Sequence, residues 1–350
     1  MDIVDNNVNV NKYININGKR HVSLSNNIAY WLKLNSKFIN VKNKLTINKY
    51  KKILNQKDIN VLIKCTKCDV NIVPILYQLN NNDIQILINK ALEYINIYMM
   101  KYIYNYIKID NELIIELATK HCENGNINVV KYLHRKSELT KQDFHLGNNL
   151  SCNNLSLRRV CQNCHLNVVK YLHRKFELIK QDFKSDNNHA CQCACGNGHV
   201  DIVKYLYQVI GLTKQDFKSL NNCACIWACY NGHVEVVEYL HQVIGLTKED
   251  FQSRDNYACQ NVCYYGHIEV VEYLHQKIRL TKQDFQSNYN YACQNVCKNG
   301  HVEVVKYLHQ VIGLTKDDFQ FNNNKAYNNA LNNNHNNVVE YLLNEIKIFS

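Results

Sequence analysis

The sequence predicts an all-α fold, a solenoid of stacked helix-turn-helix repeats with a 34-residue period. Histidines recur every 34 residues through the second half of the chain, at His165, His199, His233, His267, His301 and His335. After each histidine, apolar residues at plus 1, 3, 4 and 7 line one face of an α-helix. The chain holds one proline and 11 glycines in 350 residues, too few for a turn-dense β-sandwich.

The sequence around each histidine defines the repeated unit. One copy reads Gly232-His233-Val234-Glu235-Val236-Val237-Glu238-Tyr239-Leu240, and the next copy repeats this pattern from Gly266. An earlier unit has Asn126 at the histidine position, 39 residues before His165, so about five residues are inserted between these two units. Seven units are therefore expected between residues 112 and 346.

Each unit predicts two helices. The apolar spacing after the histidine predicts the second helix, and the tyrosine at plus 6 extends its apolar face. The segment Asn256-Tyr257-Ala258-Cys259-Gln260-Asn261-Val262-Cys263 predicts the first helix, with Asn256 as an N-cap that accepts from free backbone N–H groups. The same asparagine opens four other units, at Asn188, Asn222, Asn290 and Asn324. Gly266 follows where the chain must reverse, because glycine enters left-handed conformations without steric cost.

A recurrent segment links one unit to the next. It reads Leu212-Thr213-Lys214-Gln215-Asp216-Phe217 in one copy. Thr followed three residues later by Asp is typical of a capping box, so we expect a short helical turn with the Leu and Phe side chains packed beneath it. A long β-strand is not expected here.

These motifs resemble the ankyrin repeat, a turn followed by two antiparallel helices with a period of about 33 residues. The resemblance lies in the Ala-Cys-x-x-x-Cys/Ala-x-x-Gly-His and Val-Glu-Val-Val-x-Tyr-Leu segments and covers about two-thirds of the chain. The family's Thr-Pro-Leu-His opening is absent, and Leu-Thr-Lys-Gln-Asp-Phe replaces its Gly-Ala-Asp segment. The β-hairpin fingers of the family are therefore expected to be reduced or absent.

Composition suggests a source and a location. The repeat variant, together with abundant Asn, Ile, Lys and Tyr, resembles the ankyrin-repeat proteins of giant DNA viruses of amoebae. No run approaches the roughly 18 apolar residues of a membrane span, and the first residues do not form a signal peptide. An intracellular location, the host cytoplasm, is therefore expected, with no membrane contact.

The chain divides into four predicted regions. Residues 1–25 are polar and expected to be poorly ordered; residues 26–111 form a basic helical region with degenerate repeats; residues 112–346 hold the seven ankyrin-like repeats; and residues 347–350 form a tail. Of the net charge of +11, residues 1–110 carry +9 (16 Lys+Arg and 7 Asp+Glu), which leaves +2 for the rest.

A partner-binding surface follows from the resemblance, because ankyrin arrays usually bind partners on their concave side. By position, minus 6, minus 3 and minus 2 from the histidine should point outward, which includes Asn261 and Asn295. Trp and Tyr are enriched in binding hot spots. The predicted contact residues are Trp227, Tyr230, Tyr264, Tyr265 and Lys298. The alternative is that these rings pack between repeats.

The histidines and cysteines each admit two interpretations. The family resemblance assigns the turn histidines to hydrogen bonding within and between repeats, which leaves no need for a ligand role. Cysteine pairs such as Cys259 and Cys263 are expected to pack as small buried hydrophobes, with zinc binding as the alternative. Cys65-x-x-Cys68 and Cys161-x-x-Cys164 lack partner pairs at zinc-site spacing. No metal or cofactor is predicted.

The leading functional hypothesis is a non-enzymatic scaffold that binds an unidentified protein, because no catalytic constellation stands out. One alternative is nucleic-acid binding through the basic N-terminal third, which includes Lys42, Lys44 and Lys49, although a solvated lysine-rich face is the stronger interpretation. Another is a zinc- or redox-responsive cysteine array. A monomer is expected.

Overall fold

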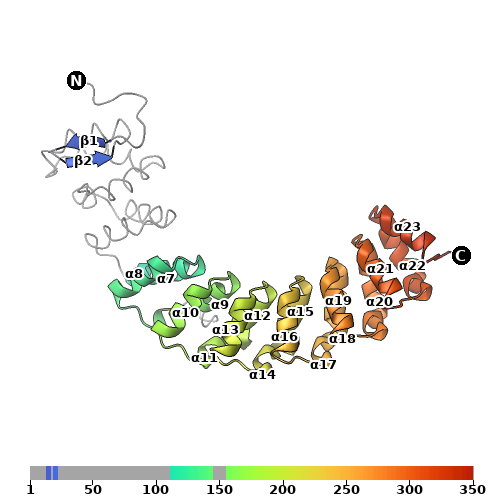
Figure 1. Ribbon diagram of the computed structural model, residues 1–350, viewed down its shortest axis with the longest axis horizontal. Helices are drawn as coiled ribbons and strands as arrows, with labels where there is room; N and C mark the ends of the chain where they lie inside the picture. Colours follow the sequence, from blue (N-terminus) through green and yellow to red (C-terminus); the bar gives the residue numbers. More distant parts are fainter. Residues whose placement is uncertain (1–12, 17–18, 23–110, 145–154, 350) are drawn as a thin grey trace, which may run out of the picture. The chain divides into compact units, whose positions relative to one another are not determined.

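The computed structural model describes residues 13–16, 19–22, 111–144 and 155–349 (Figure 1). The basic helical region predicted for residues 26–111 lies outside these residues, apart from Asn111, as does the Cys65-x-x-Cys68 motif. The chain forms two compact units, residues 1–118 with 128–138, and residues 119–127 with 139–350.

The first unit contains a pair of strands that the sequence did not predict. Strand β1 (Tyr13–Ile16) pairs antiparallel with β2 (Lys19–Val22), so that Tyr13 lies opposite Val22 and Ile16 opposite Lys19. These strands lie within the segment that was expected to be poorly ordered.

Helices make up the rest of the described chain. The elements are α7 (Asn111–Glu123), α8 (Ile127–Ser137), the 3-10 helix η1 (Gln142–Phe144), α9 (Leu155–Gln162), α10 (Leu166–Lys175), α11 (Lys180–Phe183), α12 (Ser185–Gly196), α13 (Val200–Gln208), α14 (Lys214–Phe217), α15 (Ser219–Tyr230), α16 (Val234–Gln242), α17 (Lys248–Phe251), α18 (Ser253–Tyr265), α19 (Ile268–Gln276), α20 (Lys282–Lys298), α21 (Val302–Gln310), α22 (Lys316–Asn332) and α23 (Asn336–Asn344). From α9 onward, successive hairpins stand side by side along the second unit (Figure 1).

The core lies between the two helices of each hairpin and between neighbouring hairpins. In the second helix α19, the apolar face predicted from the sequence is buried through Val270, Val271 and Leu274. The first helices pack directly against one another, α18 on α20 and α20 on α22. Their buried faces hold alanine and cysteine because small side chains let neighbouring helices approach closely, and Cys259 and Cys263 are fully buried.

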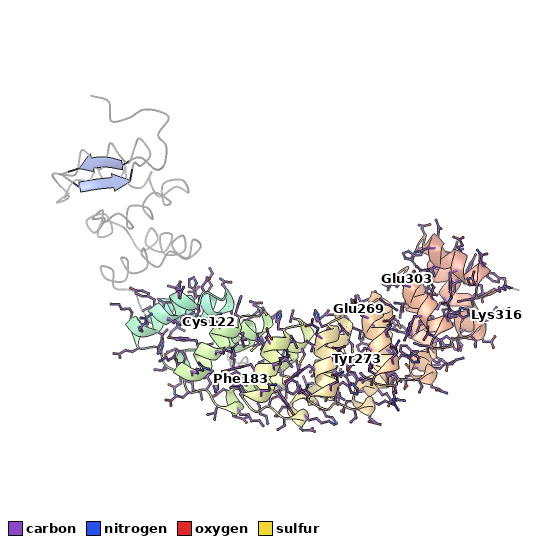
Figure 2. The ribbon with its side chains drawn as sticks, in the orientation of Figure 1. Cys122, Phe183, Glu269, Tyr273, Glu303 and Lys316 are labelled. Carbon is purple, nitrogen blue, oxygen red and sulfur yellow. The ribbon has the colours of Figure 1, made fainter. Side chains whose placement is uncertain are left out.

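The linking segments fold into the short helical turns that the sequence predicted. In α14, the Thr213 backbone N–H donates to Asp216 Oδ2 at 2.7 Å, so the aspartate satisfies a free N–H at the start of the helix. Phe217 is fully buried, and Phe183, labelled in Figure 2, occupies the same place one repeat earlier. Among the described residues, the segments that link the hairpins contain no strand.

A left-handed turn opens each first helix from α12 to α22. Three consecutive residues have positive φ and ψ, for example Arg254, Asp255 and Asn256, with φ of 54°, 56° and 60°. A left-handed residue other than glycine costs about 1–2 kcal/mol, and Asn and Asp tolerate this conformation best. The predicted N-cap role of Asn256 is therefore wrong, because its side-chain oxygen is buried without a hydrogen-bond partner among the described residues. The side-chain oxygens of Asn188 and Asn222 are buried in the same way.

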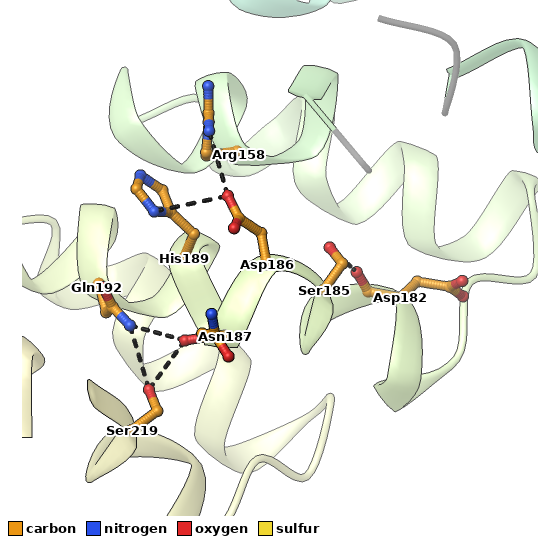
Figure 3. Close-up of polar contacts among 8 residues, drawn as sticks. All are labelled: Arg158, Asp182, Ser185, Asp186, Asn187, His189, Gln192 and Ser219. Atoms are coloured by element: carbon orange, nitrogen blue, oxygen red, sulfur yellow. Dashed lines mark hydrogen bonds and ion pairs between the residues drawn. The ribbon is translucent and has the colours of Figure 1, made fainter. Parts of the chain in front are cut away.

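Hydrogen bonds to its backbone carbonyl stabilise this left-handed turn. Figure 3 shows the turn at residues 186–188, where Gln192 Nε2 donates to the Asn187 carbonyl at 2.7 Å. Ser219 Oγ of the next repeat donates to the same carbonyl at 3.0 Å. The turn is thus held both by its own helix and by its neighbour.

The turn histidine joins each repeat to the one before it. His267 Nε2 donates to the Tyr230 carbonyl at 3.0 Å, and His301 Nε2 donates to the Tyr264 carbonyl at 3.0 Å. The imidazole also covers the preceding repeat's turn glycine, since a Cβ on Gly232 would lie 2.5 Å from His267 Nδ1. Gly232 has φ of 76°, so the glycine supplies both the left-handed turn and the space for the ring.

A second histidine column, at plus 8, joins the second helices. His241 Nδ1 lies 3.0 Å from the hydroxyl of Tyr273, which is labelled in Figure 2. Gln242 Nε2 donates to the same hydroxyl at 3.1 Å, so the hydroxyl accepts from Gln242 and can donate to His241. Equivalent bonds join His275 to Tyr307 and His309 to Tyr341.

An acidic column joins the linking segments. The carboxylate of Asp250 is buried, accepts from the Thr247 backbone N–H at 2.9 Å and pairs with Lys218 of the preceding repeat at 2.6 Å. Burial alone would raise the pKa of Asp250, but the hydrogen bonds and the lysine charge lower it below its ordinary value. Asp216, Asp284 and Asp318 have a lowered pKa through similar contacts.

Replacement of Gly232 by alanine is expected to destabilise the array more than the same change at Gly245. Both glycines have positive φ, 76° and 81°, but a Cβ on Gly245 meets nothing within 4 Å, whereas one on Gly232 meets the His267 ring. We expect a loss of about 1–2 kcal/mol for Gly245→Ala and about 2–4 kcal/mol for Gly232→Ala in urea unfolding followed by circular dichroism. Equal losses would show that the ring contact does not matter.

Replacement of Asp250 by asparagine is expected to lower the free energy of unfolding by about 2 kcal/mol at pH 7. Because the folded-state pKa of Asp250 is lowered, its contribution is present above the unfolded-state pKa and is lost as pH falls through the folded value. The difference between parent and Asp250→Asn should therefore narrow below about pH 4. Urea unfolding across pH 2–8 measures this.

Two features make this comparison specific. Burial lowers the pKa of histidines such as His233, which also reduces stability in acid, so the difference between parent and variant is the quantity to follow. Exposed Asp255→Asn is the matched control, because asparagine also tolerates the left-handed turn, and its effect should stay within about 0.5 kcal/mol. A constant Asp250→Asn difference across the pH range would contradict the assignment.

Candidate protein-binding surface

Four aromatic side chains meet at the ends of two neighbouring first helices. Trp227 and Tyr230 lie in the last turn of α15, and Tyr264 and Tyr265 are the last residues of α18. Trp227 is 45% exposed and Tyr265 is 37% exposed, while Tyr230 and Tyr264 are partly buried. We call these four residues the aromatic patch.

The rings of the aromatic patch form a continuous chain of contacts. The ring centroids of Trp227 and Tyr230 lie 5.1 Å apart, those of Tyr230 and Tyr265 4.4 Å, and those of Tyr264 and Tyr265 4.7 Å. These distances fit or closely approach favourable aromatic pairing. The Tyr230–Tyr265 contact crosses the boundary between repeats, so the rings pack between repeats and also present an exposed surface.

The hydroxyl groups of Tyr230 and Tyr265 form a hydrogen bond. This bond, together with desolvation and the neighbouring phenols, raises the pKa of Tyr265 to about 12. The hydrogen bond raises this pKa because the neutral phenol of Tyr265 can donate to Tyr230, whereas the phenolate cannot. Tyr265 therefore remains uncharged at neutral pH.

Not every predicted outward position points outward. Asn261 and Asn295 are buried, and Asn261 Nδ2 donates to the Tyr257 carbonyl of its own helix at 2.8 Å. The short amide lies within the packed first helices, whereas the larger Trp227 ring at the equivalent position extends beyond them. Lys298 is exposed and lies at the end of α20, where its carbonyl accepts from the His335 ring at 2.9 Å.

Sequence reasoning missed other exposed aromatics. Tyr257, Tyr289, Tyr291 and Phe321 are between 40% and 77% exposed. Tyr257 and Tyr291 lie ten residues before their turn histidines, and Tyr289 lies twelve before, at positions that the sequence analysis did not consider. For Tyr289 and Phe321, departure from the Asn, Asp or Ser of the other repeats was the available signal.

The fully buried cysteines of the array are packing residues. Cys191, Cys225, Cys259 and Cys293 are fully buried, and burial raises the pKa of each thiol well above its ordinary value. Raised values disfavour the thiolate that a metal or an oxidant requires. Within the described ranges, no group of three or more His, Cys, Asp or Glu side chains is placed to hold a metal ion.

The two cysteines of the Cys161-x-x-Cys164 motif differ in their exposure to solvent. Cys161 is fully buried, while Cys164 is exposed and takes the turn-glycine position with φ of 64°. Cys164 thus occupies a left-handed position that other repeats give to glycine, which accounts for its place at the surface.

Stacked helix hairpins joined by short capped turns define a helical repeat protein. The family model for ankyrin repeats matches three stretches of the chain, residues 117–216, 157–255 and 256–350. The chain belongs to the ankyrin-repeat family, and the predicted all-α ankyrin-like solenoid is confirmed.

Comparison with individual proteins adds little to this assignment. A solved ankyrin repeat family protein from Legionella pneumophila aligns over 90% of this chain and 90% of that chain, with 14% identity and a TM-score of 0.35. No curated protein matches the chain.

Membership of the ankyrin-repeat family indicates a general kind of function. Ankyrin repeats generally mediate protein–protein interaction, and the family is typically a non-enzymatic interaction scaffold. No helix in the described ranges is long and apolar enough to cross a membrane.

Replacement of Tyr230 by phenylalanine is expected to lower the pKa of Tyr265 from about 12 toward 10, because the variant removes the hydroxyl that holds the neutral form of Tyr265. Ultraviolet difference titration against the Tyr265→Phe variant isolates this one phenol. Tyr289→Phe is the control and should leave the Tyr265 titration unchanged. An unchanged pKa in Tyr230→Phe would contradict the assigned hydrogen bond.

Proposed function

We propose that this protein is a scaffold that binds a protein partner through the aromatic patch, on the side that the family uses as its concave face. The supporting observation is that four touching aromatic rings lie at the ends of α15 and α18, with Trp227 and Tyr265 open to solvent. Clusters of exposed aromatic rings are candidates for contact with another protein. Large rings with few rotatable bonds lose little entropy on binding, which makes them effective anchors.

The geometry also favours a rigid contact surface. The Tyr230 and Tyr264 carbonyls accept from His267 and His301, so the backbone beneath the patch is tied to the following repeats. When a surface is already rigid, less conformational entropy is lost as its side chains and backbone are ordered on binding. Lys298, one repeat further on, extends the proposed surface with a positive charge at its rim.

We further propose that the partner is a host protein and that the protein acts as a monomer in the host cytoplasm. This proposal rests on the sequence resemblance to ankyrin-repeat proteins of amoebal giant viruses. Apart from strands β1 and β2, the basic N-terminal third, which includes the lysines of the nucleic-acid alternative, lies outside the described residues. Buried, protonated thiols give no support to the zinc or redox alternative.

Replacement of Trp227 and Tyr264 by alanine is expected to abolish partner capture. Loss of an anchor ring at a hot spot costs about 2 kcal/mol or more, which corresponds to about a thirtyfold loss of affinity for each ring, and the double variant loses two rings. The measurement is capture from amoebal host cytosol at low and moderate salt, with mass spectrometry and then calorimetry on each retained protein.

Val243→Ala is the matched control for this experiment, because it removes an apolar side chain that is 46% exposed at the end of α16. The control should retain the partner, and circular dichroism should show that both variants are folded. A partner that binds the Trp227→Ala/Tyr264→Ala variant as tightly as the parent would disprove the proposed surface. Retention of nucleic acid alone, at low salt, would transfer the function to the basic N-terminal third.

A further inference from the structure

A second group of exposed aromatics lies at the left-handed turns of the last two repeats. Tyr289 is 77% exposed, Phe321 is 41% exposed, and their ring centroids lie 6.4 Å apart with an angle of 24° between the ring planes. The rings border a hollow of 430 Å³. The hollow, which we call the aromatic hollow, is lined by Asn288, Tyr289, Tyr291, Gln294, Phe321, Asn322 and Lys325.

Folding does not account for a tyrosine at position 289. Residue 289 is the middle of a left-handed turn, with φ of 58°, where a bulky residue is a conformational outlier. The equivalent residues in the other repeats are Asn187, Asn221, Asp255 and Asn323, which tolerate this conformation best. Tyr289 therefore accepts backbone strain while leaving most of its surface in water, and strain of this kind points to function.

Phe321 departs from the repeat pattern in a similar way. The equivalent position holds serine in the preceding repeats, at Ser185, Ser219, Ser253 and Ser287. Ser219 uses its hydroxyl to donate to the carbonyl of the preceding left-handed turn, a bond that phenylalanine cannot make. Both departures introduce an aromatic ring, and the two rings face the same hollow.

The charge of this region indicates the sign of the partner. Segments 287–300 and 321–334 contain two charged side chains, Lys298 and Lys325, and both are lysines. Lys325 lines the hollow and has no ion pair within the described part of the chain. An exposed cation without a carboxylate beside it favours an anionic group on the partner.

We propose that the aromatic hollow binds an aromatic side chain from an acidic peptide segment of the protein partner. The proposal rests on the scaffold function above and names the chemistry of what the scaffold holds. The partner's ring stacks on Tyr289 and Phe321, a neighbouring carboxylate pairs with Lys325, and the amides of Asn288 and Asn322 lie beside the peptide backbone. The volume suits one side chain and its flanking backbone.

The small number of cationic side chains at the hollow favours a peptide over a single-stranded nucleic acid as its ligand. Nucleic-acid grooves combine stacking rings with several phosphate-binding cations along the strand. One lysine lines this hollow, and its other polar side chains are amides and tyrosine hydroxyls. A chain of phosphates would lack counter-charges here, whereas a peptide with one or two carboxylates would not.

The test uses fluorescence anisotropy with a synthetic 12-residue peptide of Glu, Ser and Gly around one central Trp, and the full chain as receptor. Two peptide controls carry Gln in place of Glu, or Ala in place of Trp. The Tyr289→Asn/Phe321→Ser variant restores the residues that other repeats use, so it should fold at least as stably as the parent in urea. We expect this variant to bind the Trp peptide at least tenfold more weakly.

Two further variants separate the contributions. Lys325→Gln should weaken binding of the Glu peptide at least threefold and leave binding of the Gln peptide unchanged. The Trp227→Ala/Tyr264→Ala variant should bind the Trp peptide like the parent, so failure of the aromatic patch and failure of the aromatic hollow give different results.

Four outcomes would overturn the proposal. The parent could fail to bind the Glu–Trp peptide more tightly than both control peptides. The Tyr289→Asn/Phe321→Ser variant could bind the peptide as tightly as the parent. Lys325→Gln could leave binding of the Glu peptide unchanged. Oligothymidylate could bind the parent more tightly than the peptide and lose affinity in the same variant, which would assign the hollow to nucleic acid.

Discussion

The contact between a turn histidine and the turn of the preceding repeat, which is a glycine in most repeats, sets the geometry of the array. One imidazole donates to the neighbouring backbone, as His267 does to the Tyr230 carbonyl, and also covers Gly232 so closely that a Cβ would collide with it. Glycine suits this position in two ways, through its left-handed backbone and through its missing side chain, although Cys164 occupies it in one repeat. Because this contact fixes the distance and angle between hairpins at one end, the remaining inter-repeat contacts recur at a constant spacing.

Two other columns hold the hairpins along their length. The bond between His241 and Tyr273 joins second helices, and the ion pair between Lys218 and Asp250 joins linking segments. A repeat contacts only its neighbours, so the stability of the array is close to a sum of units and interfaces. A substitution in any column therefore weakens one interface. Acid weakens both columns, since the pKa values of His241, His275 and Asp250 are lowered and each group contributes less stability as pH falls.

The hairpins were predictable from the sequence because their signals are local and repeated. The apolar spacing that buries Val270 and Leu274, and the capped turn that buries Phe217, both follow from short-range rules. The left-handed turns were not predictable, because Asn256 before a helix is also typical of an N-cap. Local preference could not distinguish a left-handed turn from an N-cap. The turn is stabilised by hydrogen bonds that its backbone carbonyl accepts from a glutamine later in the same helix and from a serine in the next repeat. The burial of Asn261 likewise depends on neighbouring helices.

The binding surfaces depend on where the repeats differ from one another. A residue that recurs in most units, such as the turn histidine, is explained by the contact between repeats that recurs with it. Trp227, Tyr289 and Phe321 occur once each at their positions, so the common fold does not require them. Each leaves a large ring in solvent, and Tyr289 also strains its backbone. Selection for stacking alone would replace them with the asparagine or serine of the other units. The proposed contacts with a partner would account for their presence.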